Sequence, residues 1–368
     1  MSMNVNSPSL FKVQELVDYC IDFLCDSRPD LQRCALVCRS WVRPAQRLLF
    51  RNWTFLDGVP DSRRLDALEH LSHSPELLHA TVRLQTRLSF LDEPNFSALL
   101  PHLRRLRELH VGGVSPWSTS ALSSTAMVNL GALLDLPLIQ RVELAYTYLD
   151  LTAFLRIWDG CSKNIKHLVL KERVIDGGVD IWESLPSSGN RVAEMHLDSL
   201  DISDDDIGWL ATDAFPFGLS QLTTLSLTVY SETLFDWSAL GIALATIESL
   251  ELALYYTRLP DKHIQLDAMT RLRTLTFRTR SIFGGVLACL STVPPNNTVT
   301  TVRMFPRHRP PNGTLVSIDS LLATFPMLEK VGIEWAWGEN DLFECLQELR
   351  SRELLSVSIL PSAPATNA

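Results

Sequence analysis

The chain has 368 residues, more than one typical domain of about 100 to 200 residues, and this length fits a small module joined to one extended unit. Apolar residues make up 46% and charged residues 20%, which excludes a wholly disordered chain, a collagen and a coiled coil. The 33 basic and 42 acidic residues give a net charge of −9, which argues against a nucleic-acid partner and against adhesion to an anionic membrane.

The N-terminal segment, residues 1–12, is polar, and we expect it to be flexible and to contain no secretory signal. Four of the seven cysteines crowd into residues 20–38, and their odd number is not that of a disulfide framework. Reduced thiols are typical of the cytoplasm and the nucleus, where we expect the protein to act. The uncharged stretch 111–134 is too rich in serine, threonine and glycine to cross a membrane.

Residues 13–51 are expected to form three short helices. On a helical wheel the apolar residues between Leu16 and Cys25 span about 200°, twice the roughly 100° stripe that a surface helix needs for its own core. Half of that arc is therefore available to another protein. The second helix is predicted to begin near Ser27 and to place Leu31, Cys34, Cys38 and Trp41 on one side, and Pro44 is predicted to start the third.

The strings Glu15–Val17, Phe23–Leu24, Asp30–Leu31 and Leu36–Trp41 resemble an F-box, most closely the degenerate F-box-like sequences of fungi. The resemblance implies docking to the Skp-type adaptor of a cullin ubiquitin ligase. The matching apolar positions, and so the implied adaptor-binding residues, are Leu16, Ile21, Leu24, Leu36, Val37 and Trp41. One departure is Lys12-Val13, which stands where the family usually has Leu-Pro.

An alternative is that these helices only cap the rest of the chain, since the end of a repeat array needs an atypical cover. Adaptor docking predicts that Leu16, Leu36 or Trp41 is exposed. Capping predicts that the same side chains are buried against the first strands.

From residue 50 to residue 360 the chain repeats the pattern apolar-x-x-apolar-x-apolar about twelve times. Ten units begin between Leu106 and Leu354 at intervals of 25 to 33 residues, and two weaker units precede them at Phe50 and near Val82. Apolar residues three and four apart between these units predict helices, so that each unit reads as strand then helix. Such units bury their apolar faces only by stacking, which predicts an α/β solenoid.

The repeat resembles that of leucine-rich-repeat proteins, which implies a horseshoe with a parallel sheet, here preceded by a small all-α three-helix F-box. The chain departs at the ninth position of the repeat, where the usual Asn or Cys is replaced by residues such as Val114, Thr147 and Arg173. The last residues, 361–368, are expected to be disordered.

Candidate target-binding residues lie on the inner face of the predicted sheet and just beyond its strands. Arginines concentrate between residues 271 and 309, and aromatic residues recur directly after strands, where exposed rings act as anchors. Solvated loops and rings buried at the repeat edge are the alternatives. The residues chosen are Tyr148, Tyr230, Tyr256, Arg278, Arg303 and Trp337.

We expect no catalytic, cofactor or metal site. Zinc sites usually have Cys pairs two to four residues apart on a turn, and Cys20, Cys25, Cys34 and Cys38 do not fit this arrangement. Cys34 and Cys38 fall on the apolar side of a predicted helix, where a Cys commonly acts as a small apolar residue. The sequence lacks nucleotide-binding and nucleophile motifs. It therefore favours a non-enzymatic substrate receptor of a Skp-cullin-F-box ubiquitin ligase, monomeric outside the complex, with a target that the sequence does not identify. The alternative is a leucine-rich-repeat binding scaffold with no ubiquitin role.

Overall fold

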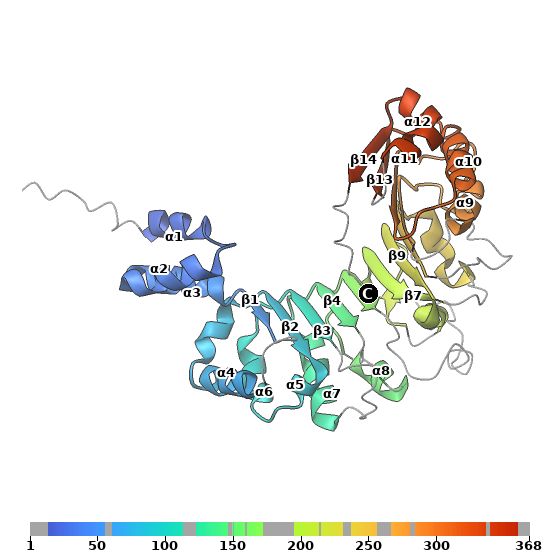
Figure 1. Cartoon of the computed structure of the whole chain (residues 1–368). Coiled ribbons are helices and arrows are strands. Elements are labelled where there is room, and N and C mark those ends of the chain that lie inside the picture. The colour runs from blue at the N-terminus through green and yellow to red at the C-terminus, as the bar shows by residue number, and fades with distance from the viewer. Residues whose placement is uncertain are drawn as a thin grey trace, which may run out of the picture. The chain divides into compact units, whose positions relative to one another are not determined.

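The computed structural model describes residues 14–55, 61–112, 123–145, 149, 151–158, 160–171, 195–212, 215–230, 237–255, 266–279, 284–335 and 339–359. The predicted flexible N-terminus and disordered tail lie outside these residues. The chain divides into two compact units (Figure 1), one of Met1–Thr147 with Arg156–Asn164 and the other of Tyr148–Leu155 with Ile165–Ala368. Twelve strands belong to a large parallel sheet, so that the fold is an α/β solenoid-like repeat structure.

The first unit opens with the predicted three helices, and their boundaries differ from those expected. They are α1 (Gln14–Asp22), α2 (Arg28–Val37) and α3 (Arg39–Leu49). The break between the second and third helices falls at Cys38, whose backbone is extended (φ −162°, ψ 165°), and not at Pro44, which lies inside α3. The sequence pattern predicts that Cys38 and Trp41 continue the apolar side of α2. In the structure they do not, because α2 ends at Val37.

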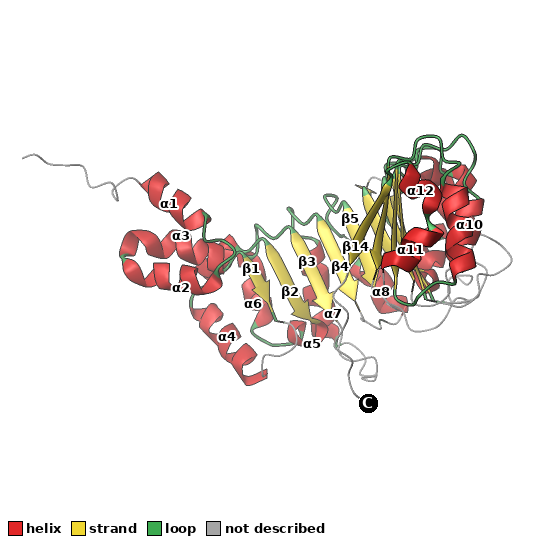
Figure 2. Ribbon diagram, turned by 45° about the horizontal axis from the view of Figure 1, so that its top comes forward, coloured by secondary structure: helices red, strands yellow, loops and turns green. Residues whose placement is uncertain are grey.

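Four parallel strands follow α3 in the first unit (Figure 2). They are β1 (Asn52–Thr54), β2 (Arg83–Arg87), β3 (Glu108–Gly112) and β4 (Arg141–Ala145). The elements between them are α4 (Asp61–His73), the 3-10 helix η2 (Pro75–Ala80), α5 (Leu88–Leu91), α6 (Phe96–Leu99), η3 (Leu100–His102) and α7 (Ser124–Leu134). After β4 comes α8 (Leu151–Ile157), whose residues are divided between the two units.

Eight strands of the second unit are parallel and nearly in sequence order. They are β5 (His167–Lys171), β7 (Ser199–Ser203), β9 (Thr224–Val229), β10 (Ser249–Leu254), β11 (Thr274–Thr279), β12 (Thr301–Pro306), β13 (Lys330–Trp335) and β14 (Leu355–Ile359). A separate two-stranded sheet pairs β6 (Met195–His196) with β8 (Phe217–Gly218). The helices are η5 (Asp204–Ala211), η6 (Trp237–Ala245), η7 (Leu266–Ala268), α9 (Gly284–Ser291), α10 (Asn312–Leu322), α11 (Glu339–Cys345) and α12 (Gln347–Ser351).

The repeat pattern predicts most of these strands with the correct inward residues. In β11, for example, Leu275 and Phe277 are fully buried, whereas Arg278 between the inward positions is exposed. One of the ten units matches the sequence pattern at Val192, Met195 and Leu197, and this placement is wrong because the strand of the large sheet lies five residues later. There Leu197, Leu200 and Ile202 are the buried set.

Two further units have a shifted register. In β2, Leu84 pairs with Leu109, so the inward positions are Thr81, Leu84 and Thr86 rather than the set built on Val82. The two threonines are fully buried, and each places a methyl group where the pattern expects a larger apolar residue. At the other end, Val357 pairs with Ile333 and not with Val331 as the pattern predicts.

Threonine hydroxyls connect neighbouring repeats just before two of the strands. The hydroxyl of Thr246 donates to the carbonyl of Leu222 at 2.8 Å, and that of Thr298 donates to the carbonyl of Leu272 at 2.9 Å. Each bond satisfies a carbonyl of the preceding repeat at the edge where strands begin. These bonds add side-chain links between successive repeats at this edge of the sheet.

Candidate functional site

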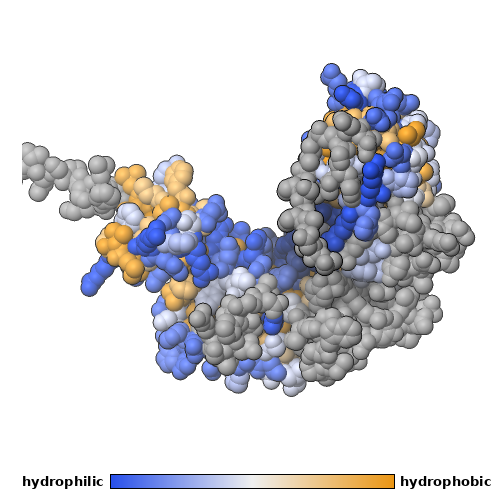
Figure 3. All heavy atoms as spheres, viewed as in Figure 1, coloured by the Kyte–Doolittle hydropathy of each residue, from blue (hydrophilic) through white to orange (hydrophobic). Residues whose placement is uncertain are grey.

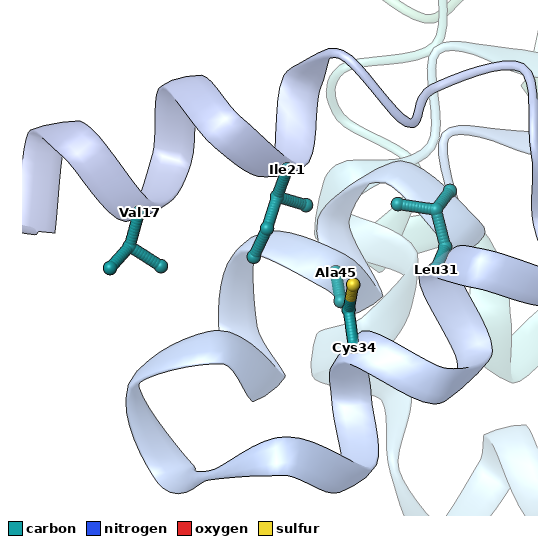
Figure 4. Close-up of a cluster of buried hydrophobic side chains, with 5 residues drawn as sticks. All are labelled: Val17, Ile21, Leu31, Cys34 and Ala45. Carbon is teal, nitrogen blue, oxygen red and sulfur yellow. The ribbon is translucent and has the colours of Figure 1, made fainter. Parts of the chain in front are cut away.

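Helix α1 carries two apolar faces, and the first of them belongs to the core of the three helices. Val17 and Ile21 on α1 pack with Leu31 and Cys34 on α2 and with Ala45 on α3 (Figure 4). Ile21 is 0% exposed. In this arrangement Ile21 holds α1 onto the other two helices.

A side-chain hydrogen bond from Gln14 connects the start of α1 to the beginning of α3, at a carbonyl that a proline leaves without its helical partner. Pro44 has no backbone N–H, so the carbonyl of Ser40, four residues earlier, lacks its usual helical donor. The side-chain Nε2 of Gln14 donates to this carbonyl at 3.3 Å. At the other end of α1, Arg47 forms an ion pair with Asp22 at 3.2 Å.

The second apolar face of α1 points away from the helical core. Its exposed large residues are Leu16 and Tyr19, which are 46% and 63% exposed, and Phe23, in the turn directly after α1, is 71% exposed. The rings of Tyr19 and Phe23 meet edge to face, with centroids 4.9 Å apart. This contact orders the two rings on the surface of the helix.

The end of α2 adds two more exposed apolar side chains. Leu36 is 87% exposed and Val37 is 63% exposed in the last turn of α2, which ends at Cys38. Figure 3 shows hydrophobic side chains gathered on the surface of these helices. We call the five residues the outer apolar face, namely Leu16, Tyr19, Phe23, Leu36 and Val37.

The structure separates the six predicted adaptor-binding residues into three groups. Leu16, Leu36 and Val37 are exposed, Leu24 and Trp41 are partly buried against the helical core, and Ile21 is inside it. Tyr19 and Phe23 were not among the predicted contacts. Their spacing of three and seven residues from Leu16, which continues the helical period just past the end of α1 at Asp22, is the signal that could have found them.

The end of α3 joins the three helices to the first repeats. The backbone N–H groups of Val82 and Arg83 both donate to the carbonyl of Arg51, at 2.8 and 3.1 Å. The hydroxyl of Thr81 donates to the carbonyl of Phe50 at 3.1 Å, and the Phe50 ring stacks on Trp53. These contacts connect the repeats to the last turn of α3 and leave the outer apolar face uncovered.

Cys38 stands beside the outer apolar face as the residue before α3. Its sulfur lies 3.0 Å from the hydroxyl of Ser40. This hydrogen bond lowers the pKa of the Cys38 thiol, with help from the backbone N–H groups of Trp41 and Ser40 and against the effect of partial desolvation. Among the described residues, no group of three or more His, Cys, Asp or Glu side chains could hold a metal ion.

The predicted target-binding residues fall partly outside the described part of the chain. Tyr148, Tyr256 and Trp337 lie outside it, while Tyr230 is half-buried and packs against Tyr255 with ring centroids 4.7 Å apart. Arg278 and Arg303 are both exposed, on the face of the sheet opposite the buried side chains.

Arg278 is held from two sides. It forms an ion pair with Glu251 on the neighbouring strand, and the centre of its guanidinium lies 4.5 Å from the centroid of the Phe305 ring. A surface pocket of about 230 Å³ opens beside these groups, and its polar and aromatic lining includes Tyr255, Arg278, Phe305, Arg307 and Glu334. The pocket lies where β10 to β13 end.

No protein-family model matches the sequence, and no curated protein matches it. Among solved structures, the chain is similar to one in the crystal structure of the Rad7 and Elc1 complex in yeast, at 11% identity and a TM-score of 0.35, covering 96% of this chain and 98% of that one. In the described part of the chain, no helix is both long enough and apolar enough to span a membrane.

Proposed function

We propose that this protein is a substrate receptor of a Skp-cullin-F-box type ubiquitin ligase, and that its outer apolar face docks to the Skp-type adaptor. The observation that carries the proposal is the exposure of Leu36 and Val37 at the end of α2, next to a helical core that is already complete without them. Large apolar side chains grouped on a surface mark a protein contact.

The alternative, that the helices only cap the repeats, predicts burial of these side chains. Leu36 is instead 87% exposed and Leu16 is 46% exposed. The hydrogen bonds of Thr81, Val82 and Arg83 join the repeats to Phe50 and Arg51, directly after α3. Capping accounts for this end of α3 and gives no reason for apolar residues on the outside of α1 and α2.

In this proposal the protein acts by proximity and does no chemistry of its own. The adaptor and cullin hold the chain through α1 and α2, the repeats bind a target protein, and other subunits transfer ubiquitin. The hydrogen bonds from Val82 and Arg83 to Arg51 keep the docking helices fixed to the first repeats. Such a complex places the protein in the cytoplasm or the nucleus.

The test is co-expression of the full chain with a Skp-type adaptor, followed by affinity capture of the adaptor. Leu36→Asp places a charge in the proposed interface and is expected to abolish retention. Val128→Asp is the matched control, because Val128 is 70% exposed on α7 and outside the outer apolar face. Trp41 is a poor choice, since it packs against the helical core and its loss would disturb the fold.

Retention of the native chain and of Val128→Asp, with loss of Leu36→Asp, supports the proposal. Circular dichroism checks that the Leu36→Asp chain is folded. A native chain that is not retained, or equal retention of all three, contradicts adaptor docking through this face.

A further inference from the structure

The exposed face of β11 to β13, opposite the buried side chains, has a charge of opposite sign to that of the whole chain. Arg278, Arg303, Arg307 and Lys330 project from this face or directly after it, against the two carboxylates Glu251 and Glu334. The surplus is positive, although the whole chain carries a net charge of −9. A local surplus of this kind attracts a partner of the opposite charge.

Arg303 is exposed and has no charged neighbour in register on the adjacent strands. Its two neighbours in register are Thr276 on β11 and Gly332 on β13, both small and uncharged. A Cβ atom on Gly332 would lie 3.7 Å from Cγ of Arg303, so the arginine stem runs past the glycine. Within the described residues neither Arg303 nor Arg307 forms an ion pair, and both are exposed.

The spacing along β12 sets the shape of the ligand. Arg303 and Phe305 lie on one face of β12, and Arg307 follows its last residue, Pro306. The backbone N–H of Arg307 still donates to the carbonyl of Thr279 on the neighbouring strand at 3.0 Å, so the chain direction continues for one residue past the strand. Residues two apart in a strand are about 6.6 Å apart. An extended peptide has the same spacing on its own facing side, so its alternate side chains meet this row one for one.

We propose that Arg303, Phe305 and Arg307, here called the β12 stripe, bind an extended acidic segment of the target protein, with carboxylate, apolar and carboxylate side chains at alternate positions. The two arginines pair with the carboxylates. The apolar side chain meets the Phe305 ring and enters the pocket of about 230 Å³ beside it. The identification of this segment with a ubiquitination target rests on the proposed function, whereas the binding chemistry does not.

The cations favour a carboxylate-bearing peptide over a compact phosphate dianion, and the net charge of −9 argues against a nucleic acid. They are spread along the strand rather than gathered around one point, and Arg278 is already neutralised in part by Glu251. Glu334 also lines the pocket and repels a closely bound dianion. Separate single charges on an extended chain fit this arrangement better than one concentrated charge.

The test measures binding of the full chain to an array of peptides of the form Glu-x-Leu-x-Glu, with the same peptides bearing Gln in place of Glu as the reference. Gly332→Glu places a carboxylate beside Arg303 without removing any contact, and is expected to weaken binding about tenfold. Gly332→Gln adds similar bulk without charge and is expected to retain native affinity. Arg303→Glu is expected to weaken binding by at least about tenfold as well.

Preference for Glu over Gln peptides, lost in Gly332→Glu and kept in Gly332→Gln, supports the β12 stripe. Equal binding of Glu and Gln peptides, or tighter binding of phosphopeptides or of single-stranded RNA, overturns it. The Leu36→Asp chain serves as a separate reference, because it is expected to bind the peptides normally. Loss of adaptor retention with intact peptide binding, or the reverse, then shows which of the two proposals has failed.

Discussion

Replacing Leu36 and Ile21 by alanine should affect two different properties of the molecule. Both residues match the apolar positions of an F-box, yet Leu36 is 87% exposed and Ile21 is 0% exposed. Complete burial of a leucine side chain stabilises by about 1.5 to 3 kcal/mol. Burying the exposed 87% of Leu36 under an adaptor would then contribute about 1.3 to 2.6 kcal/mol, or about ten- to eighty-fold in Kd.

Leu36→Ala keeps one carbon of the side chain, so we expect a loss of adaptor affinity near the lower end of this range. The free energy of unfolding should stay within about 0.5 kcal/mol of the native value, because little of the side chain is buried in the free chain. Ile21→Ala leaves a cavity among Val17, Leu31 and Ala45, and such substitutions cost about 2 to 5 kcal/mol of stability.

Calorimetric titration with the adaptor gives the affinities, and chemical denaturation followed by circular dichroism gives the stabilities. The reasoning is refuted if Leu36→Ala destabilises the chain as much as Ile21→Ala. It is also refuted if Leu36→Ala binds the adaptor with native affinity.

Three further substitutions or measurements probe the fold around these surfaces. Asp319→Ala removes the carboxylate that accepts the N–H groups at the start of α12 at 2.8 and 3.0 Å, and is expected to cost about 3 kcal/mol by denaturation, whereas Asp319→Asn should cost less because it keeps one acceptor. Thr81→Val removes the hydroxyl that donates to Phe50, and should cost about 1 kcal/mol, with Thr81→Ser near native; equal losses would contradict a role for the hydroxyl. The Ser40 hydroxyl lowers the pKa of the Cys38 thiol, so Cys38 should react with iodoacetamide at a lower pH than a free thiol. Burial raises the pKa of Cys289 to about 12 and should protect it from the same reagent. Mass spectrometry of alkylated peptides across pH 6 to 9 measures both reactions.

The repeat was readable because its evidence is periodic. A strand with alternating inward residues repeats at nearly constant intervals, so that errors in one unit do not affect the others. The pattern misplaces a strand where a residue that is not large and apolar fills a buried position, or where two overlapping sets of apolar residues both match it. Threonine does so at Thr81 and Thr86, and the segment around Met195 offers a second apolar set, Leu197, Leu200 and Ile202, only five residues further on.

The boundary between α2 and α3 was not readable from local propensity. Proline usually starts a helix, so Pro44 predicts a helix beginning there. In the structure, Pro44 sits inside α3, because Gln14 from another helix satisfies the Ser40 carbonyl that the proline leaves free. Such tertiary compensation depends on a contact between residues far apart in sequence, which no local pattern contains.

The small size of the helical core predicts that the three helices become more stable when the proposed adaptor binds. Five residues form this core, and five large apolar residues remain exposed around it, namely Leu16, Tyr19, Phe23, Leu36 and Val37. A segment of fewer than about 40 residues buries too little apolar surface to be strongly stable alone. A partner that covers the outer apolar face therefore stabilises these helices by binding only their folded form. Hydrogen exchange in α1 and α2 should consequently slow on adaptor binding, while exchange in β11 to β13 stays unchanged.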